Sequence, residues 1–375
     1  MSEMISLRNA YAYAIEKVRR NAPRIGVSFP HVAIDDGRYN SERPSFWTNG
    51  FWPGLLWLSY METGDESLRN IAEDIEKVQD DTMFHFESLH HDVGFQWIPM
   101  ALADYRITGN EESCTRAYKA AILLASRFNP EGRYLRAWND GKEGNRDSSG
   151  WAIIDCLMNI PILYWASKEY QDPRFRNIAV AHVDTILKYS IREDGSTAHI
   201  TRFDSNTGEF LSHGGGQGKS PDSSWARGQG WLIYGMAISY RETGNERYLE
   251  AAMKASRNFM ERLPEDGIPY WDFDSDEEDR WVRDSSAAAI AASGMLEIAS
   301  LSKGEDECEF RSMAESLLLA LTENVAVFDD STEGILRLGT VNYTNRKHIN
   351  VPIIYGDYFY IEALRKYLGK ASGLF

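Results

Sequence analysis

The stretch Thr63-Gly64-Asp65-Glu66 has the composition of a helix end that is followed at once by a helix start. Glycine suits the left-handed residue that closes a helix, and aspartate is a preferred N-cap for the next helix. The pattern recurs at Thr108-Gly109-Asn110-Glu111, Tyr170-Gln171-Asp172-Pro173, Thr243-Gly244-Asn245-Glu246 and Lys303-Gly304-Glu305-Asp306. These copies predict a series of tight helical hairpins.

The segments beside the turns have helical periodicity, for example an apolar stripe through Leu249, Ala252, Ala255 and Phe259. Further helices near residues 4–21 and 357–369 bring the total to about twelve. Antiparallel helices alternate in direction, so the tight turns lie at one end and the long loops at the other. Six such hairpins close most simply into an all-α (α/α)6 toroid. An open solenoid is the alternative, and it would show a more regular repeat.

Composition bounds the class of protein. The 375 residues contain no Gly/Ser-rich or Pro-rich linker, so we expect a single domain spanning residues 1–375. The net charge of −16 argues against nucleic acids and anionic membranes as partners, because binding a polyanion needs an excess of Lys and Arg. The first twenty residues predict an amphipathic helix and not a signal peptide. No apolar run is long enough to span a membrane. The three cysteines are isolated in the sequence, which is typical of a reducing compartment. We therefore expect a cytoplasmic protein.

Asp155 stands in the middle of the apolar run 151–165, with no basic residue within a helical turn. An ionised carboxylate in such surroundings costs several kcal/mol unless it is paired, and the usual escape is to keep its proton. A carboxylic acid that is protonated near neutral pH can act as a general acid. The alternative is a structural aspartate bonded to nearby backbone.

Asp155 also distinguishes one copy of a second repeat. The triplet Asp-Ser-Ser occurs at residues 147–149, 222–224 and 284–286, and each copy is predicted to cap an inner helix. Eight residues after the aspartate, the copies carry Asp155, Gly230 and Ala292. One acid among three copies is typical of a functional residue added to a repetitive scaffold.

The long-loop end of the predicted ring collects the candidate functional residues. Tryptophans there alternate with Gly, Gln and Arg, most densely in residues 224–231, and this mixture indicates a sugar pocket more than a plain aromatic core. Asp92 is either a helix N-cap or a second carboxylate that pairs with Asp155 in glycoside chemistry. Arg227 is the natural bidentate anchor for a substrate carboxylate, and a solvated surface arginine is the alternative.

The sequence His90-His91-Asp92 invites a metal interpretation, which we reject because adjacent side chains point to different sides of a helix or strand. Metal-binding pairs on a helix are spaced three or four residues apart. No metal is therefore expected at these residues. No organic cofactor is expected either.

Five motifs follow one another in a fixed order: His90-His91-Asp92-Val-Gly-Phe, Ile-Ile-Asp155-Cys-Leu-Met-Asn, Trp225-Ala-Arg227-Gly-Gln-Gly-Trp231, Tyr270-Trp271-Asp272-Phe273 with Arg283-Asp-Ser-Ser-Ala, and Gly356-Asp-Tyr-Phe-Tyr. Together they resemble the unsaturated glucuronyl hydrolases of glycoside hydrolase family 88. The resemblance runs from the N-terminal helix to the last, and it implies an (α/α)6 barrel.

The resemblance also implies an unusual reaction, the hydration of the C4=C5 enol ether of a 4,5-unsaturated uronic acid on a small anionic oligosaccharide. By that matching, Asp155 donates a proton to C4 and helps activate the water that adds at C5, and Asp92 is the second essential carboxylate. The uronate subsite would be lined by Trp47, His91, Gln217, Trp225, Arg227 and Trp231. The expected substrates are lyase-generated oligosaccharides, with glycosaminoglycans as the expected source.

The sequence departs from some of these relatives where Gly215-Gly216 precede Gln217 in place of Thr-His, so a contact to the leaving sugar is missing or rebuilt. The basic loop 342–348, with Arg346 and Lys347, either receives a sulfate on the second sugar or is a solvated charged loop. Two other functions stay open. One is an unsaturated rhamnogalacturonyl hydrolase of family 105 acting on pectin-derived disaccharides, and the other is a non-catalytic toroid that binds a sugar or a protein.

Overall fold

The helical hairpins appear at the predicted turns. The computed structural model describes residues 5–34, 36–140, 147–370 and 373–375. Its paired helices are α2 (Phe51–Thr63) with α3 (Glu66–Phe84), α5 (Ala103–Thr108) with α6 (Glu111–Ala125), α7 (Pro161–Glu169) with α8 (Pro173–Tyr189), α9 (Ala226–Thr243) with α10 (Glu246–Glu261), and α11 (Ser285–Leu301) with α12 (Glu305–Asn324). The predicted terminal helices are α1 (Leu7–Ile25) and α13 (Ile354–Tyr367).

The predicted turn chemistry is present in most of the hairpins. Left-handed φ angles of 68°, 76° and 70° occur at Gly64, Gly109 and Gly244. A side-chain oxygen accepts a backbone N–H of the following helix at Asp65, Asn110, Asp172 and Asn245. The turn before α12 differs, because Gly304 is itself the N-cap and has no side chain to accept such a bond.

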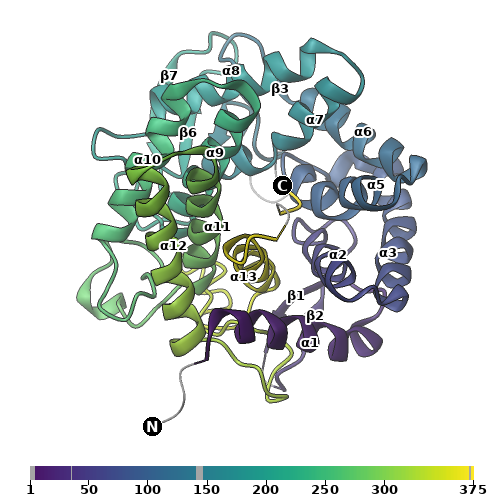
Figure 1. Ribbon diagram of the computed structural model, residues 1–375. Coiled ribbons are helices and arrows are strands. Elements are labelled where there is room, and N and C mark those ends of the chain that lie inside the picture. Colours follow the sequence, from purple (N-terminus) through teal and green to yellow (C-terminus); the bar gives the residue numbers. More distant parts are fainter. Residues whose placement is uncertain (1–4, 35, 141–146, 371–372) are drawn as a thin grey trace.

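The helices surround a centre in which the C-terminus lies (Figure 1). The inner helix α11 is buried at every residue from 285 to 299, whereas the outer helix α10 buries only one face. A Cβ on Gly294 of α11 would lie 2.9 Å from Cα of Tyr234 on α9, so this glycine lets two inner helices approach closely. This double layer is the predicted (α/α)6 toroid. None of the helices in the described ranges is long and apolar enough to cross a membrane.

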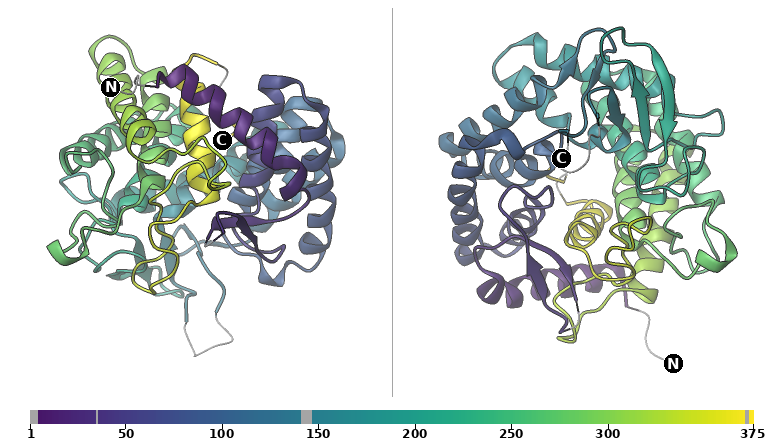
Figure 2. Two further views of the ribbon diagram at one scale, coloured as in Figure 1. Left: turned by 90° about the horizontal axis from the view of Figure 1, so that it is seen from below. Right: turned by 180° about the vertical axis from the view of Figure 1, so that it is seen from behind.

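Short antiparallel strands occupy the long-loop end, a feature that the all-α prediction omitted (Figure 2). The pairs are β1 (Pro30–Ala33) with β2 (Tyr39–Ser41) and β3 (Phe128–Asn129) with β4 (Tyr134–Leu135), and the largest sheet joins β5 (Trp151–Ile153), β6 (Ile200–Phe203) and β7 (Phe210–Gly214). Each strand spans five residues or fewer, so the helical ring still determines the architecture.

The prediction that Asp-Ser-Ser triplets cap inner helices is wrong in detail. Residues 147–149 precede strand β5 and a 3-10 segment (Ile154–Met158), because residues 151–153 pair with β6 before Pro161 starts α7. Residues 222–224 end before Trp225, the N-cap of α9. Asp284 does precede α11, but its side chain makes no capping bond. Its carboxylate binds an arginine instead, as described below.

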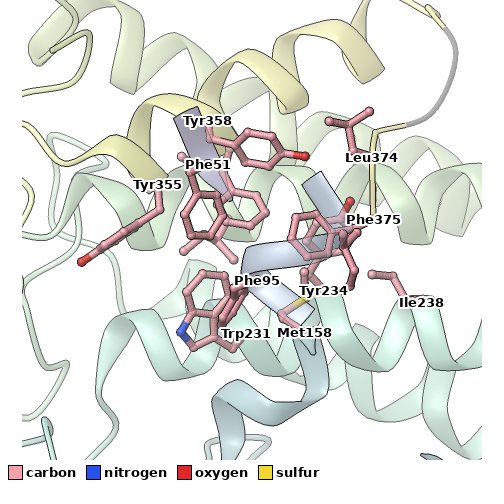
Figure 3. Close-up of a cluster of buried hydrophobic side chains, with 14 of the residues drawn as sticks. Phe51, Phe95, Met158, Trp231, Tyr234, Ile238, Tyr355, Tyr358, Leu374 and Phe375 are labelled. Atoms are coloured by element: carbon pink, nitrogen blue, oxygen red, sulfur yellow. The ribbon is translucent and has the colours of Figure 1, made fainter. Parts of the chain in front are cut away.

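Phe375 belongs to a cluster of buried hydrophobic side chains that includes Phe95 and Tyr234 (Figure 3). Its ring centroid lies 5.7 Å from that of Phe359 and 6.2 Å from that of Phe95. Phe95 in turn lies 4.9 Å from Trp231 and 5.5 Å from Trp47. The last residue of the chain therefore supports an aromatic floor that reaches the long-loop end.

We expect Phe375→Ala to lower the free energy of unfolding by about 3–5 kcal/mol, because truncating a buried ring loses packing and leaves a cavity. Urea unfolding followed by tryptophan fluorescence measures the change. Phe84→Ala is the matched control, since that ring is 77% exposed, and it should change stability by no more than about 0.5 kcal/mol. Equal losses in the two variants would contradict the assigned role of Phe375.

Candidate active site

Asp92 and Asp155 lie close together at the long-loop end. Asp92 is the N-cap residue of α4 (Val93–Trp97), and Asp155 belongs to the 3-10 segment before α7. Nδ2 of Asn159 donates to Oδ1 of Asp92 at 3.3 Å and to the backbone oxygen of Asp155 at 3.2 Å. Both aspartates are buried. One amide thus joins the two residues that the sequence singled out.

Asp92 is surrounded by groups that favour its ionised form. Nε2 of His91 lies 3.0 Å from Oδ1 of Asp92, and Nδ1 of His90 lies 3.4 Å from Oδ2. Burial alone would raise the pKa of Asp92, but the charge and hydrogen bond of His91, assisted by His90 and Asn159, hold that pKa below its usual range. Asp92 is therefore a carboxylate, not a proton donor, near neutral pH.

The reason given for rejecting a metal at His90-His91-Asp92 is wrong. The ligand atoms of these residues lie within 4.8 Å of one another. They converge because they lie in the turn before α4, where the two imidazole rings stack with centroids 5.3 Å apart. Nδ1 of His91 donates to the carbonyl of Ala137 at 2.7 Å, which leaves Nε2 to face Asp92. The absence of a metal cofactor stays a prediction.

Asp155 faces His199, a residue that the sequence did not single out. Nε2 of His199 lies 3.4 Å from Oδ2 of Asp155. The other ring nitrogen, Nδ1, accepts the backbone N–H of Gln217 at 2.8 Å. Because a neutral imidazole has one donor and one acceptor, this bond places the hydrogen on Nε2, toward Asp155. His199 therefore connects the Gln217 loop to the Asp155 carboxyl group.

Gly216 is required by this contact. Its φ is +59°, and a Cβ at this position would lie 2.1 Å from Nδ1 of His199. A side chain here would displace either the loop or the imidazole. The departure from relatives at Gly215-Gly216 thus has a local structural reason at the second of the two glycines.

The three predicted tryptophans occupy different levels of the site. Trp47 is half-buried, with its ring centroid 5.1 Å from that of Tyr355. Trp225 is almost covered and lies 4.5 Å from His199. Trp231 is fully buried between Phe95 and Phe359. Its predicted place in the lining of the subsite is therefore corrected to a place in the floor behind it.

Both terminal nitrogens of the Arg227 guanidinium group donate hydrogen bonds to acceptors of the protein. Nη1 donates to Asp284 and to the carbonyl of Thr340, the latter at 2.8 Å. Nη2 donates to Oε1 of Gln217 at 3.0 Å and to the carbonyl of Val341 at 2.7 Å. The predicted bidentate grip on a substrate carboxylate would break several of these bonds. Arg227 instead fixes the amide of Gln217, whose Nε2 is left to point away from the arginine.

Arg346 and Lys347 lie on an exposed loop beside this cluster. The guanidinium carbon of Arg346 lies 4.0 Å from the ring centroid of Tyr343. The hydroxyl of Thr344 donates to the carbonyl of Gly216 at 3.4 Å, so the loop touches the segment that carries Gln217. The structure places both basic residues at the border of the candidate site.

Sequence reasoning missed three residues of this site. Trp138 lies between the two imidazoles, 6.1 Å from His91 and 6.2 Å from His199 by ring centroids. Asn159 was present in a quoted motif, and its spacing of four residues from Asp155 was the available signal. His199 had no such signal, because it reaches Asp155 only through the pairing of β5 with β6.

A separate cavity of about 750 Å³ opens at the tight-turn end. Its charged lining residues largely neutralise one another, for example Lys366 and Arg241, which bind Glu297 at 2.9 and 2.6 Å. It is lined by neither Asp92 nor Asp155. This cavity is not the candidate active site.

Comparison with known proteins gives one consistent result. The family model for Glycosyl Hydrolase Family 88 matches residues 22–375. A relative from Bacillus sp. (strain GL1), an unsaturated glucuronyl hydrolase, is 38% identical over 95% of each chain. A relative from Streptococcus pyogenes serotype M1, an unsaturated chondroitin disaccharide hydrolase, is 34% identical over 96% of this chain and 91% of its own.

Solved structures share the fold as well. A UGL variant with dGlcA-Glc-Rha-Glc superposes with a TM-score of 0.89 at 36% identity, and the match covers 96% of each chain. Similarity at this level over nearly the whole chain shows that the two proteins share the fold.

Proposed function

The chain belongs to glycosyl hydrolase family 88, and on that premise we propose that it is an unsaturated glucuronyl hydrolase. The observation that carries the proposal is the pair Asp92 and Asp155, held by Asn159 at the long-loop end. Its substrates are lyase-generated oligosaccharides that begin with a 4,5-unsaturated uronic acid. A glycosaminoglycan source is supported by the chondroitin disaccharide activity of the streptococcal relative. A cytoplasmic location is part of the proposal.

The reaction adds one water molecule across C4=C5. Asp155 transfers its proton to C4, and the positive charge that develops at C5 is taken up by the oxygen of a water molecule. That water returns a proton to Asp155, so the carboxyl group is regenerated. The resulting hemiketal opens and rearranges, which releases the downstream sugar and a 4-deoxy-5-keto uronate.

The assignment of Asp155 as the donor follows from the unlike surroundings of the two acids. Asp92 has a pKa held below its usual range, so it has no proton to give near neutral pH. As an anion, it binds ring hydroxyls and stabilises the positive charge near C5. Nε2 of His199 lies 3.4 Å from Oδ2 of Asp155 and keeps a polar group beside that carboxyl group.

The uronate is held by the residues around this pair. Trp47 offers an aromatic surface to the sugar, and the almost covered Trp225 supports His199 and Arg227 beside it. His91 stays in contact with Asp92. The amide of Gln217 donates to the substrate, with Arg227 behind it as a positive charge that favours the anionic sugar. Trp231 supports the floor.

A panel of unsaturated disaccharides tests the proposal, because hydration removes the ultraviolet absorbance of the enol ether. We expect loss of absorbance with a chondroitin-derived disaccharide and little with a pectin-derived one. Turnover of the pectin-derived substrate alone would favour the family 105 activity. Binding without turnover of either substrate would favour a non-catalytic sugar-binding toroid.

Arg346 and Lys347 are expected to bind a sulfate group on the second sugar. We expect the double variant Arg346→Ala, Lys347→Ala to lower kcat/KM for a 6-sulfated disaccharide about tenfold, since the two lost contacts at an exposed site are together worth roughly 1.4 kcal/mol. The unsulfated disaccharide is the control and should change less than about twofold. An equal effect on both substrates would remove the sulfate assignment. The exposed pair Arg19 and Lys77, replaced by Ala on helices α1 and α3, provides a charge-matched control.

A further inference from the structure

Trp281 is unusual among the 11 tryptophans of the chain. Its surface is 58% exposed, whereas the other ten, all of them in the described ranges, are buried or half-buried. Leaving so much indole in water forgoes a substantial hydrophobic gain. A single exposed apolar residue is common on a protein surface, but this ring is held in a fixed position by its neighbours.

The indole of Trp281 is held in place by contacts with the segment 343–350. It meets the ring of Tyr343 edge-on, at 6.3 Å between centroids and 87° between planes. The hydroxyl of Tyr343 donates to Asp279, and Nδ2 of Asn350 donates to the carbonyl of Trp281 at 2.9 Å. Segments 279–281 and 343–350 are therefore tied together beneath the exposed indole.

The same segment also connects Trp281 to the candidate active site. Val341 accepts a hydrogen bond from Arg227, and two residues further along the chain is Tyr343. Tyr343 packs against Trp271 at 4.8 Å, and the backbone oxygen of Trp271 accepts the N–H of Ala226 at the start of α9. The ring of Tyr343 thus contacts both Arg346 of the basic loop and Trp281, which places the indole next to the loop expected to meet the second sugar.

The charge around the indole selects the kind of sugar. Residues 276–279 read Asp-Glu-Glu-Asp. Glu277 and Glu278 are exposed and form no ion pair with another described residue. The basic groups nearby are already engaged, Lys219 with Asp276 at 2.7 Å and Arg346 over the ring of Tyr343 at 4.0 Å. Carboxylates this near to Trp281 disfavour an anionic sugar and tolerate a neutral one. The hydrophobic face of a neutral hexose fits an exposed indole. A structurally similar UGL variant holds dGlcA-Glc-Rha-Glc, whose sugars after the first are uncharged.

We propose that Trp281 forms a distal subsite that stacks on an uncharged sugar beyond the second residue of a longer oligosaccharide. The inference rests on the proposed function and extends it from disaccharides to a preference among longer substrates. A glycosaminoglycan tetrasaccharide, which carries another uronate at its third position, gains nothing from this subsite.

The test compares kcat/KM for dGlcA-Glc-Rha-Glc, for the disaccharide dGlcA-Glc and for an unsaturated chondroitin tetrasaccharide. In Trp281→Ala we expect KM for dGlcA-Glc-Rha-Glc to rise about three- to tenfold with kcat unchanged, the size of one aromatic contact. The other two substrates should change less than about twofold, and Trp281→Tyr should recover most of the loss. Phe84→Ala, another exposed ring, is the control.

Equal effects on all three substrates, or none on dGlcA-Glc-Rha-Glc, would overturn the subsite. A loss confined to the chondroitin tetrasaccharide would overturn the assignment to a neutral sugar. If the protein turns over no substrate, the proposed function fails, and calorimetry still decides the subsite. In that measurement Trp281→Ala must weaken binding of dGlcA-Glc-Rha-Glc and not of dGlcA-Glc.

Discussion

Asp155→Asn is expected to lower kcat on an unsaturated disaccharide by about 10²–10⁴-fold, because an amide cannot give a proton to C4. The substitution preserves size and polarity, so the fold should persist. Loss of the enol ether absorbance measures turnover, and circular dichroism with thermal unfolding checks the structure. The effect should fall mainly on kcat, since the carboxyl group acts in the transition state more than in binding.

Asp222→Asn is the matched control, because Asp222 is an exposed acid in another copy of the Asp-Ser-Ser repeat. That variant should keep at least about half of the wild-type activity, as surface substitutions away from a site usually do. Retention of more than about a tenth of kcat in Asp155→Asn would refute the proton-donor role. If unsaturated disaccharides bind but neither the wild type nor Asp155→Asn turns them over, a non-catalytic binding toroid would be favoured.

Arg227→Met should destabilise the protein by about 3–5 kcal/mol, because it leaves the buried carboxylate of Asp284 without its partner. Burial already raises the pKa of Asp284 in spite of the pull of Arg227 in the opposite direction. A carboxyl group with a raised folded-state pKa contributes stability at low pH that is lost as the pH rises through that value. Arg227→Met should therefore lower the free energy of unfolding more at pH 7 than at pH 5.

Chemical unfolding of Arg227→Met at the two pH values measures this effect. The double variant Arg227→Met, Asp284→Asn is the control, since removing both charges should recover part of the stability. A small loss in Arg227→Met, with a large rise in KM, would instead restore Arg227 as a direct anchor of the substrate carboxylate. No recovery in the double variant would show that the pair is not the cause of the loss.

Local sequence was sufficient for much of the fold. The caps at Gly64, Asp65, Gly109 and Asn110 act through the nearest neighbours in the chain, so their composition predicted the turns. The alternation of tight turns with long loops then placed the candidate residues at one end. The strands were missed because they are short, and their pairing joins segments far apart in sequence, such as residues 151–153 with 200–202.

The candidate site divides in the same way. Asp92 and Asp155 could be predicted because each breaks its local pattern, one beside two histidines and the other inside an apolar run. His199 could not, because its approach to Asp155 depends on strand pairing. The acceptors of Arg227 could not be predicted either, since they come from residues 217, 284, 340 and 341.

The sequence by itself determined the helical hairpins and singled out the two acids, because capping and helical periodicity are interactions within about four residues. Closure into a ring depended on packing between distant helices, since the same hairpins could also stack into an open solenoid. Only the tertiary structure decided which side chains surround those acids, how deeply each tryptophan is buried, and which acceptors bind Arg227. These outcomes depend on contacts between distant segments, whose partners no local pattern specifies.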